Sequence, residues 1–156
     1  MKAVSAVIIK KELQHLSSDK LMELCLRLSR FKKENKELLT YLLFESHNEI
    51  SYTESIKNYM DDEFEKINTH SYFYIRKSVR KVLKNVKKFI RYSQKKETEA
   101  ELLLYFCKKL KDFKPSIKHS TQLQNSYDRQ ILLAKKIITQ LHEDLQYDYN
   151  VMIEDL

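Results

Sequence analysis

Hydrophobic residues recur every three or four positions along almost the whole chain, which is the spacing of one face of an α-helix. Polar clusters that can cap helices interrupt this pattern at intervals. The pattern predicts helices at about 3–15, 19–32, 35–46, 52–67, 71–94, 98–113 and 118–149. Short connections make consecutive helices antiparallel neighbours. We therefore predict a single all-α domain over residues 1–156, built from about seven antiparallel helices.

Successive helical hairpins can assemble as a helical-hairpin stack (a HEAT-like superhelix) or as an irregular bundle. Seven helices are too many for a simple four-helix bundle, and the similar hairpin lengths favour the stack. In the last helix, the apolar residues step alternately by four and three, as in a coiled coil: Tyr127, Ile131, Ala134, Ile138, Leu141 and Leu145. This helix is expected to pack lengthwise along the others, and a homodimer through the same seam is a second hypothesis.

Glycine is absent from the 156 residues, and the one proline, Pro115, follows the sixth predicted helix. This composition disfavours tight β-hairpins and so supports the helical prediction. It also excludes a P-loop, a dinucleotide-binding fingerprint, a glycine-flanked nucleophile elbow and a standard EF-hand loop. We therefore predict a protein that is not an enzyme, with no catalytic residues and no cofactor. The sequence identifies no small-molecule ligand.

The two cysteines, Cys25 and Cys107, both have apolar neighbours, and we expect two buried free thiols. No apolar run is long enough to span a bilayer, and the apolar run near the N-terminus is too short for a secretory signal. These features predict a cytoplasmic protein without membrane insertion.

Charge is distributed unevenly along the chain. Ten basic residues and no acidic residue lie between Arg76 and Lys96, whereas the whole chain is only +7, so the other residues together are net −3. Residues 45–65 carry a net charge of −6 and residues 137–156 a net charge of −5. Either acidic segment could cover the basic run, and the second could do so in the same chain or in a neighbouring copy.

The basic residues form a narrow stripe when they are placed on a helix. At about 100° per residue, the stripe lies opposite a full apolar face. Phe73 projects onto the same side, where it could stack on a base or receive a guanidinium group. Three of the six arginines lie on the stripe, and the planar arginine fork suits carboxylate and phosphate groups. The predicted binding residues for an anionic partner are Arg76, Arg80, Lys84, Lys87, Arg91 and Phe73.

This stripe supports more than one interpretation. The leading hypothesis is a helical interaction module that binds an acidic protein partner through the basic helix at 71–94. The alternative is that the same helix binds nucleic acid, mainly through the phosphate backbone. A solvated helix face, neutralised by the acidic segments of the same fold, explains the charge without any partner.

Enzyme and metal hypotheses rest on weaker patterns. Asp61 and Glu65 lie one helical turn apart and, with Asp62, could hold a hard cation in a metal-dependent enzyme. Isolated acidic runs are usually solvated, so we predict no metal site. The one Glu-x-x-His motif, Glu12 and His15, falls short of the pair of motifs that a di-iron bundle needs.

Overall fold

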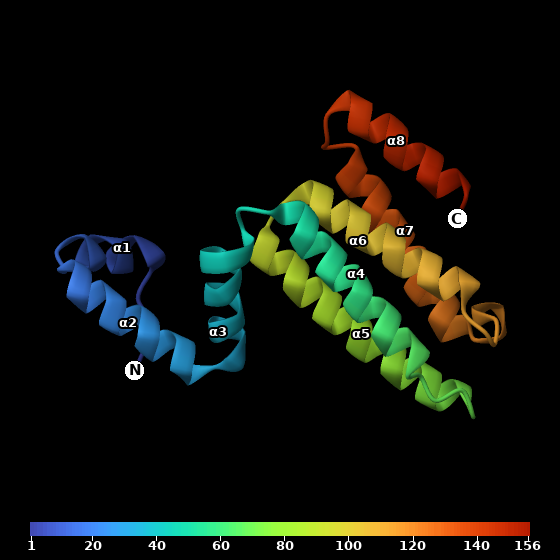
Figure 1. Ribbon diagram of the computed structural model, residues 1–156, viewed down its shortest axis with the longest axis horizontal. Helices are drawn as coiled ribbons and strands as arrows, with labels where there is room; N and C mark the ends of the chain where they lie inside the picture. Colours follow the sequence, from blue (N-terminus) through green and yellow to red (C-terminus); the bar gives the residue numbers. More distant parts are fainter. The chain divides into compact units, whose positions relative to one another are not determined.

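The computed structural model describes all 156 residues and contains helices and no strands, which confirms the all-α prediction. It has eight α-helices where about seven were predicted (Figure 1). The chain divides into two compact units, Met1–Phe44 and Glu45–Leu156, which we describe separately. No result tests the prediction of a single domain, which stays a prediction.

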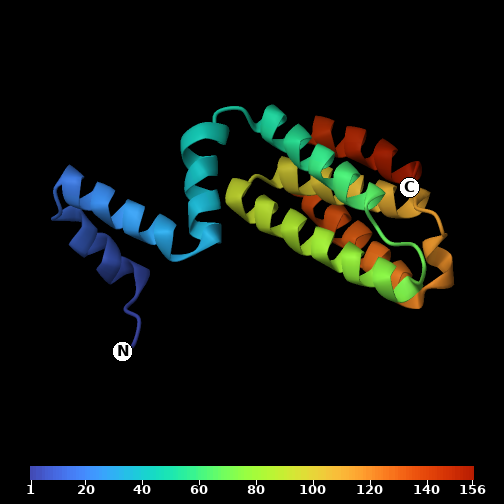
Figure 2. The same ribbon diagram turned by 60° about the horizontal axis from the view of Figure 1, so that its bottom comes forward.

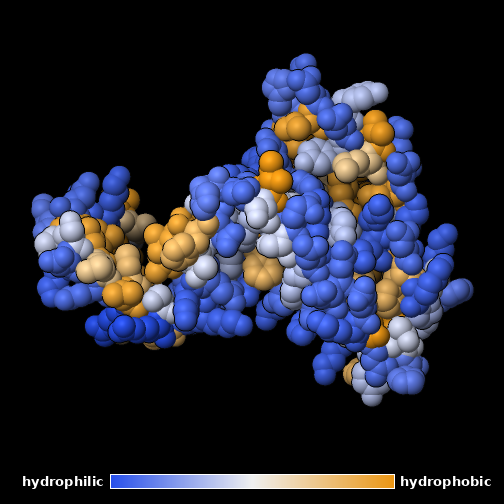
Figure 3. Space-filling model, viewed as in Figure 1, coloured by the Kyte–Doolittle hydropathy of each residue, from blue (hydrophilic) through white to orange (hydrophobic).

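The first unit contains α1 (Ala6–Gln14), α2 (Ser18–Phe31) and α3 (Lys33–Thr40), and a short π-helical turn (Tyr41–Glu45) follows. The Ser17 side chain caps α2 by accepting a hydrogen bond from the backbone N–H of Lys20. Helices α2 and α3 pack together, and Asn35 Nδ2 donates to the Leu28 carbonyl at 2.8 Å. No residue of these three helices is buried, and apolar side chains reach the surface of this unit (Figure 3).

The second unit is an irregular helical bundle, the second of the two predicted arrangements. It contains α4 (Glu49–Glu65), α5 (Tyr72–Ser93), α6 (Lys96–Asp112), a 3₁₀ turn (Ile117–His119), α7 (Thr121–Ile138) and α8 (Glu143–Glu154). Helix α6 is central, because it contacts α4, α5, α7 and α8 (Figure 2). Its residues Leu102, Leu103, Phe106 and Leu110 are fully buried. The burial of these large apolar side chains is the main stabilising contribution in the bundle.

The prediction of one long helix over 118–149 is wrong. Helix α7 ends at Ile138, and α8 begins at Glu143 after a turn that includes Thr139 and His142. The Thr139 side chain donates to the Lys136 carbonyl, and His142 Nδ1 accepts from the Asp144 backbone N–H, so local side-chain bonds end one helix and start the next. The apolar spacing continues across the turn because α8 packs its own apolar side, which is half-buried, against α6 and α7. The continuous seam proposed for a homodimer is therefore interrupted.

The prediction of two buried thiols is half wrong, because Cys107 is buried and Cys25 is exposed. Cys25 lies on α2, where a unit of three short helices is too small to cover the apolar side of each helix. Burial raises the pKa of the Cys107 thiol to about 12, and nearby Asp128 adds to the rise.

We predict that a thiol reagent modifies one cysteine, Cys25, in the folded protein near pH 8. A thiolate is the reactive form, and the Cys107 thiol is protonated and inaccessible at this pH. Intact-mass spectrometry after alkylation should show one adduct in the native state and two in denaturant. Two adducts in the native state would contradict the buried position of Cys107.

Candidate anion-binding groove

Helix α5 carries the basic stripe because its apolar residues repeat at helical spacing on the opposite side. Five of these residues are buried against the bundle: Ile75, Val79, Val82, Val86 and Ile90. Leu83 and Phe89 project onto the same side of the helix and are half-buried. The packed face fixes the rotation of the helix, so the basic side chains point away from the core.

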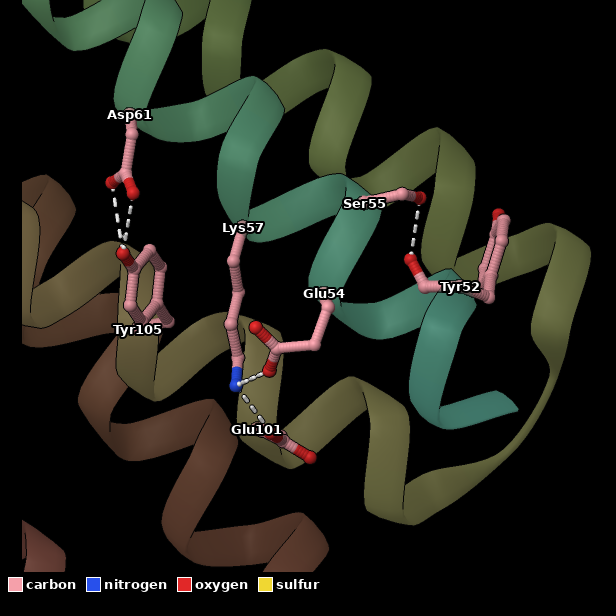
Figure 4. A network of polar contacts seen from close by, with 7 residues as sticks. All are labelled: Tyr52, Glu54, Ser55, Lys57, Asp61, Glu101 and Tyr105. Atoms are coloured by element: carbon pink, nitrogen blue, oxygen red, sulfur yellow. Dashed lines mark hydrogen bonds and ion pairs between the residues drawn. The ribbon is translucent and has the colours of Figure 1, made fainter. Parts of the chain in front are cut away.

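The acidic helix α4 directs much of its charge toward α6 (Figure 4). The Lys57 ammonium group lies 2.6 Å from carboxylate oxygens of both Glu54 and Glu101. Further along, the Tyr105 hydroxyl donates to Asp61 at 2.8 Å, and Lys109 pairs with the same carboxylate at 2.8 Å. These contacts hold α4 against α6. They also pair acidic groups of the segment that could have covered the basic helix.

The pKa shifts in this network follow from its contacts. Burial opposes ionisation of Asp61, but hydrogen bonds from Lys109 and Tyr105 outweigh burial and lower the pKa of the carboxyl group. Burial raises the pKa of Tyr105 to about 12, and its hydrogen bond to Asp61 adds to the rise. Burial opposes the charge on Lys57, but its two glutamate partners prevail and raise the pKa. These groups therefore stay in their charged or hydrogen-bonded states at neutral pH.

Two carboxylates of α4 do reach the basic run. Glu63 pairs with Lys81 at 3.1 Å, and Glu49 pairs with Lys95 at 3.2 Å. Neither pair involves the predicted stripe, and no carboxylate lies within ion-pair distance of any of its five basic residues: Arg76, Arg80, Lys84, Lys87 and Arg91. Internal neutralisation by residues 45–65 is therefore partial.

A groove of about 430 Å³ lies between α5 and α7. Arg76, Arg80 and Lys87 line it from α5, and Arg129 lines it from α7. Its aliphatic lining comes from Val79 and Leu83 of α5 and from Leu123 and Leu133 of α7. The groove thus combines an aliphatic floor with cationic groups that come from both helices.

A second hollow of about 620 Å³ continues along α5 and shares Arg76, Arg80 and Gln122 with the groove. Phe73 lines this hollow with 62% of its surface exposed, and its ring packs edge-to-face on Tyr74 at 5.5 Å between centroids. Lys84 lines the same hollow, whereas Arg91 lines neither of the two. The structure therefore brings five of the six predicted binding residues around two connected hollows, and Arg91 lies beyond them.

Helix α7 contributes groove residues that the sequence analysis did not identify. Arg129 is one of them, and Gln122, Asn125 and Gln130 are others. Gln130 is 4% exposed, its Nε2 donates to the Ser126 carbonyl at 3.1 Å, and its Oε1 has no hydrogen-bond partner. The only signal for these residues in the sequence was an arginine within a polar stretch of the last predicted helix. The sequence did not show that this arginine faces α5.

The other candidate sites gain no support from geometry. The Asp61 carboxylate is occupied by Tyr105 and Lys109, and no group of three or more His, Cys, Asp or Glu side chains is arranged to hold a metal ion. The helices of this chain also lack the combination of length and apolar character that a membrane crossing requires.

No protein-family model, no curated protein sequence and no solved structure matches this chain. The residues of the α5–α7 groove therefore carry the functional argument.

Proposed function

We propose that this protein is a helical interaction module whose α5–α7 groove binds an acidic segment of a partner protein. The observation that carries the proposal is the absence of carboxylate partners around a groove lined by three arginines and a lysine. Such groups are solvated in the free protein and available to an anionic ligand. Arginine binds carboxylates through two parallel hydrogen bonds, so the Glu or Asp side chains of a protein ligand suit these groups.

The floor of the groove supports a peptide over a nucleic acid. Leu83 and Leu133 are half-buried, so part of their aliphatic surface is available to the side chains of a ligand. An amphipathic acidic helix presents apolar anchors flanked by carboxylates, which matches an aliphatic floor with cationic edges. Bases of a nucleic acid stack on aromatic rings, and no aromatic residue lines the α5–α7 groove.

A second candidate function, binding of single-stranded nucleic acid, is favoured by one observation. Phe73 is 62% exposed in the second hollow, beside Arg76 and Lys77. An exposed ring with cations around it can stack a base while phosphates contact the basic groups. This candidate uses the same end of α5, so one titration separates the two functions.

The test is a titration of the wild-type protein with two fluorescent probes at several salt concentrations. One probe is a helical peptide of about 12 residues with Glu and Leu on one face, and the other is an oligothymidylate of about 20 nucleotides. We expect the peptide to bind more tightly, with an affinity that falls as salt rises. A peptide of the same composition with its Leu and Glu positions scrambled should bind more weakly.

Absence of peptide binding at about 50 mM salt would overturn the proposed function. Tighter binding of the oligonucleotide, with a steep dependence on salt, would replace it with the nucleic-acid function.

A further inference from the structure

Helix α8 has an acidic outer face with apolar residues at its centre. At about 100° per residue, its inner side carries Leu145, Tyr149 and Ile153, all half-buried. The opposite arc, about 140° wide, carries five exposed acidic residues: Glu143, Asp144, Asp148, Glu154 and Asp155. Tyr147 and Val151 lie within the same arc and are 72% and 45% exposed. The outer face of α8 is therefore an acidic, partly apolar helical surface.

This surface cannot reach the groove of its own chain. Helix α8 packs on α6 and α7, and these helices lie between it and α5 in both views (Figures 1 and 2). Its end is held in place, because Lys111 donates to the Asp155 carbonyl at 2.6 Å and Tyr127 donates to the Leu156 carbonyl at 2.8 Å. The acidic face is thus fixed outward, and no basic side chain pairs with Glu143, Asp148 or Glu154.

We propose that the outer face of α8 in one copy docks into the α5–α7 groove of a second copy. The inference rests on the proposed function and names the partner as the chain itself. The groove presents Arg76, Arg80, Lys87 and Arg129, and α8 presents five carboxylates. Complementary charge of this kind steers association and fixes its register.

The dimensions and the apolar groups of the two surfaces also match. From Glu143 to Glu154 and from Arg76 to Lys87 the helices both rise about 16 Å, so the acidic and basic stretches are equal in length. Tyr147 and Val151 provide apolar groups at the centre of the acidic face, where the aliphatic floor of the groove would receive them. The inner face of α8 stays packed on its own α6 and α7, so docking needs no unfolding.

The contact uses different surfaces on the two copies. Such a heterologous contact leaves a free groove on one copy and a free α8 face on the other. Further copies can therefore add, and the assembly either closes into a ring or continues as an open chain. The wild-type protein is therefore expected to form a concentration-dependent series of oligomers at low salt. High salt should return it to the monomer, because the contact depends on exposed charges.

Complementary variants test the inference by sedimentation velocity. The α8 variant combines E143Q, D148N and E154Q, and the groove variant combines R76E and R80E. Either variant alone should stay monomeric at about 100 μM protein and about 50 mM salt, because either one lacks one of the two surfaces. Mixing the two should give a one-to-one dimer and no larger species, since one intact groove and one intact α8 remain.

Several outcomes would overturn the inference. One is a wild-type protein that stays monomeric at about 100 μM and about 50 mM salt. Another is an α8 variant that assembles as well as the wild type, and a third is a mixture that forms no dimer. Titration of the α8 variant with the acidic peptide separates this failure from that of the proposed function, because its groove is intact. Circular dichroism melting of both variants should match the wild type, since the changed side chains lie outside the buried core.

Discussion

Reversing three arginines around the groove, with R76E, R80E and R129E in one chain, is expected to weaken binding of the acidic peptide at least about 100-fold at low salt. A hydrogen bond to a charged group contributes about 1.5–3 kcal/mol, and each reversal also introduces repulsion of the ligand carboxylates. None of the three arginines has a carboxylate partner in the chain, so their loss leaves no buried acid unpaired. Fluorescence anisotropy with the labelled peptide measures the effect.

The matched control changes the same number of charges elsewhere on the second unit. Lys108, Lys118 and Lys135 are exposed and line neither of the two hollows along α5. The variant K108E, K118E, K135E should therefore bind the peptide within about threefold of the wild type, since distant exposed charges are screened by salt. Equal losses in both variants would show that net charge, and not the groove, determines binding.

The single variant R129E separates a groove from a surface made by α5 alone. If both helices hold the ligand, reversal of Arg129 weakens binding about as much as reversal of Arg80, by roughly tenfold or more. A ligand that follows only α5 would leave the affinity of R129E close to that of the wild type. The comparison thus maps the ligand across two elements that lie about 50 residues apart in the sequence.

The sequence predicted α5 well because both of its faces are strongly patterned. Ile75, Val79, Val82, Val86 and Ile90 repeat at helical spacing and are all buried, so the rotation of this helix could be derived without any knowledge of its neighbours. The position of the basic stripe follows directly from that rotation. The number of helices in the chain, about seven predicted and eight observed, was nearly right for the same reason, since each amphipathic segment can be recognised from its own residues.

The groove itself could not be predicted, because it depends on which helix lies beside α5. Arg129 shares the groove with Arg76 only because α7 and α5 both pack against α6. The turn at 139–142 could not be recognised from the apolar spacing of the last two helices. This spacing can continue unchanged through a turn at which the chain reverses direction. Capping bonds at such a turn are short-range features, and the sequence offers many competing candidates for them.

The geometry of the groove depends on the packing around α6, and Phe106 is the largest fully buried residue there. Its ring contacts Phe64 of α4 edge-to-face at 5.9 Å between centroids, and Phe64 makes a similar contact with Phe113. Phe106 therefore joins the central helix α6 to the acidic helix α4. It lines neither of the two hollows along α5, so it can affect binding only through the stability of the bundle.

Replacing Phe106 with alanine is expected to destabilise the second unit by about 3–5 kcal/mol, because the change removes buried apolar area and leaves a cavity. This loss is a large fraction of the 5–15 kcal/mol that typically separates folded and unfolded states, and it should lower the melting temperature by more than about 10 °C. Urea unfolding followed by circular dichroism measures the free energy of unfolding.

The control L132A, at a position 67% exposed on α7, should change the free energy of unfolding by less than about 0.5 kcal/mol. The apparent affinity of the F106A protein for the peptide should fall only as far as its folded fraction falls, because the groove residues are unchanged and peptide binding draws unfolded chains into the folded state. A loss below about 1 kcal/mol would contradict the prediction and would mean that the surrounding core closes the cavity left by the missing ring.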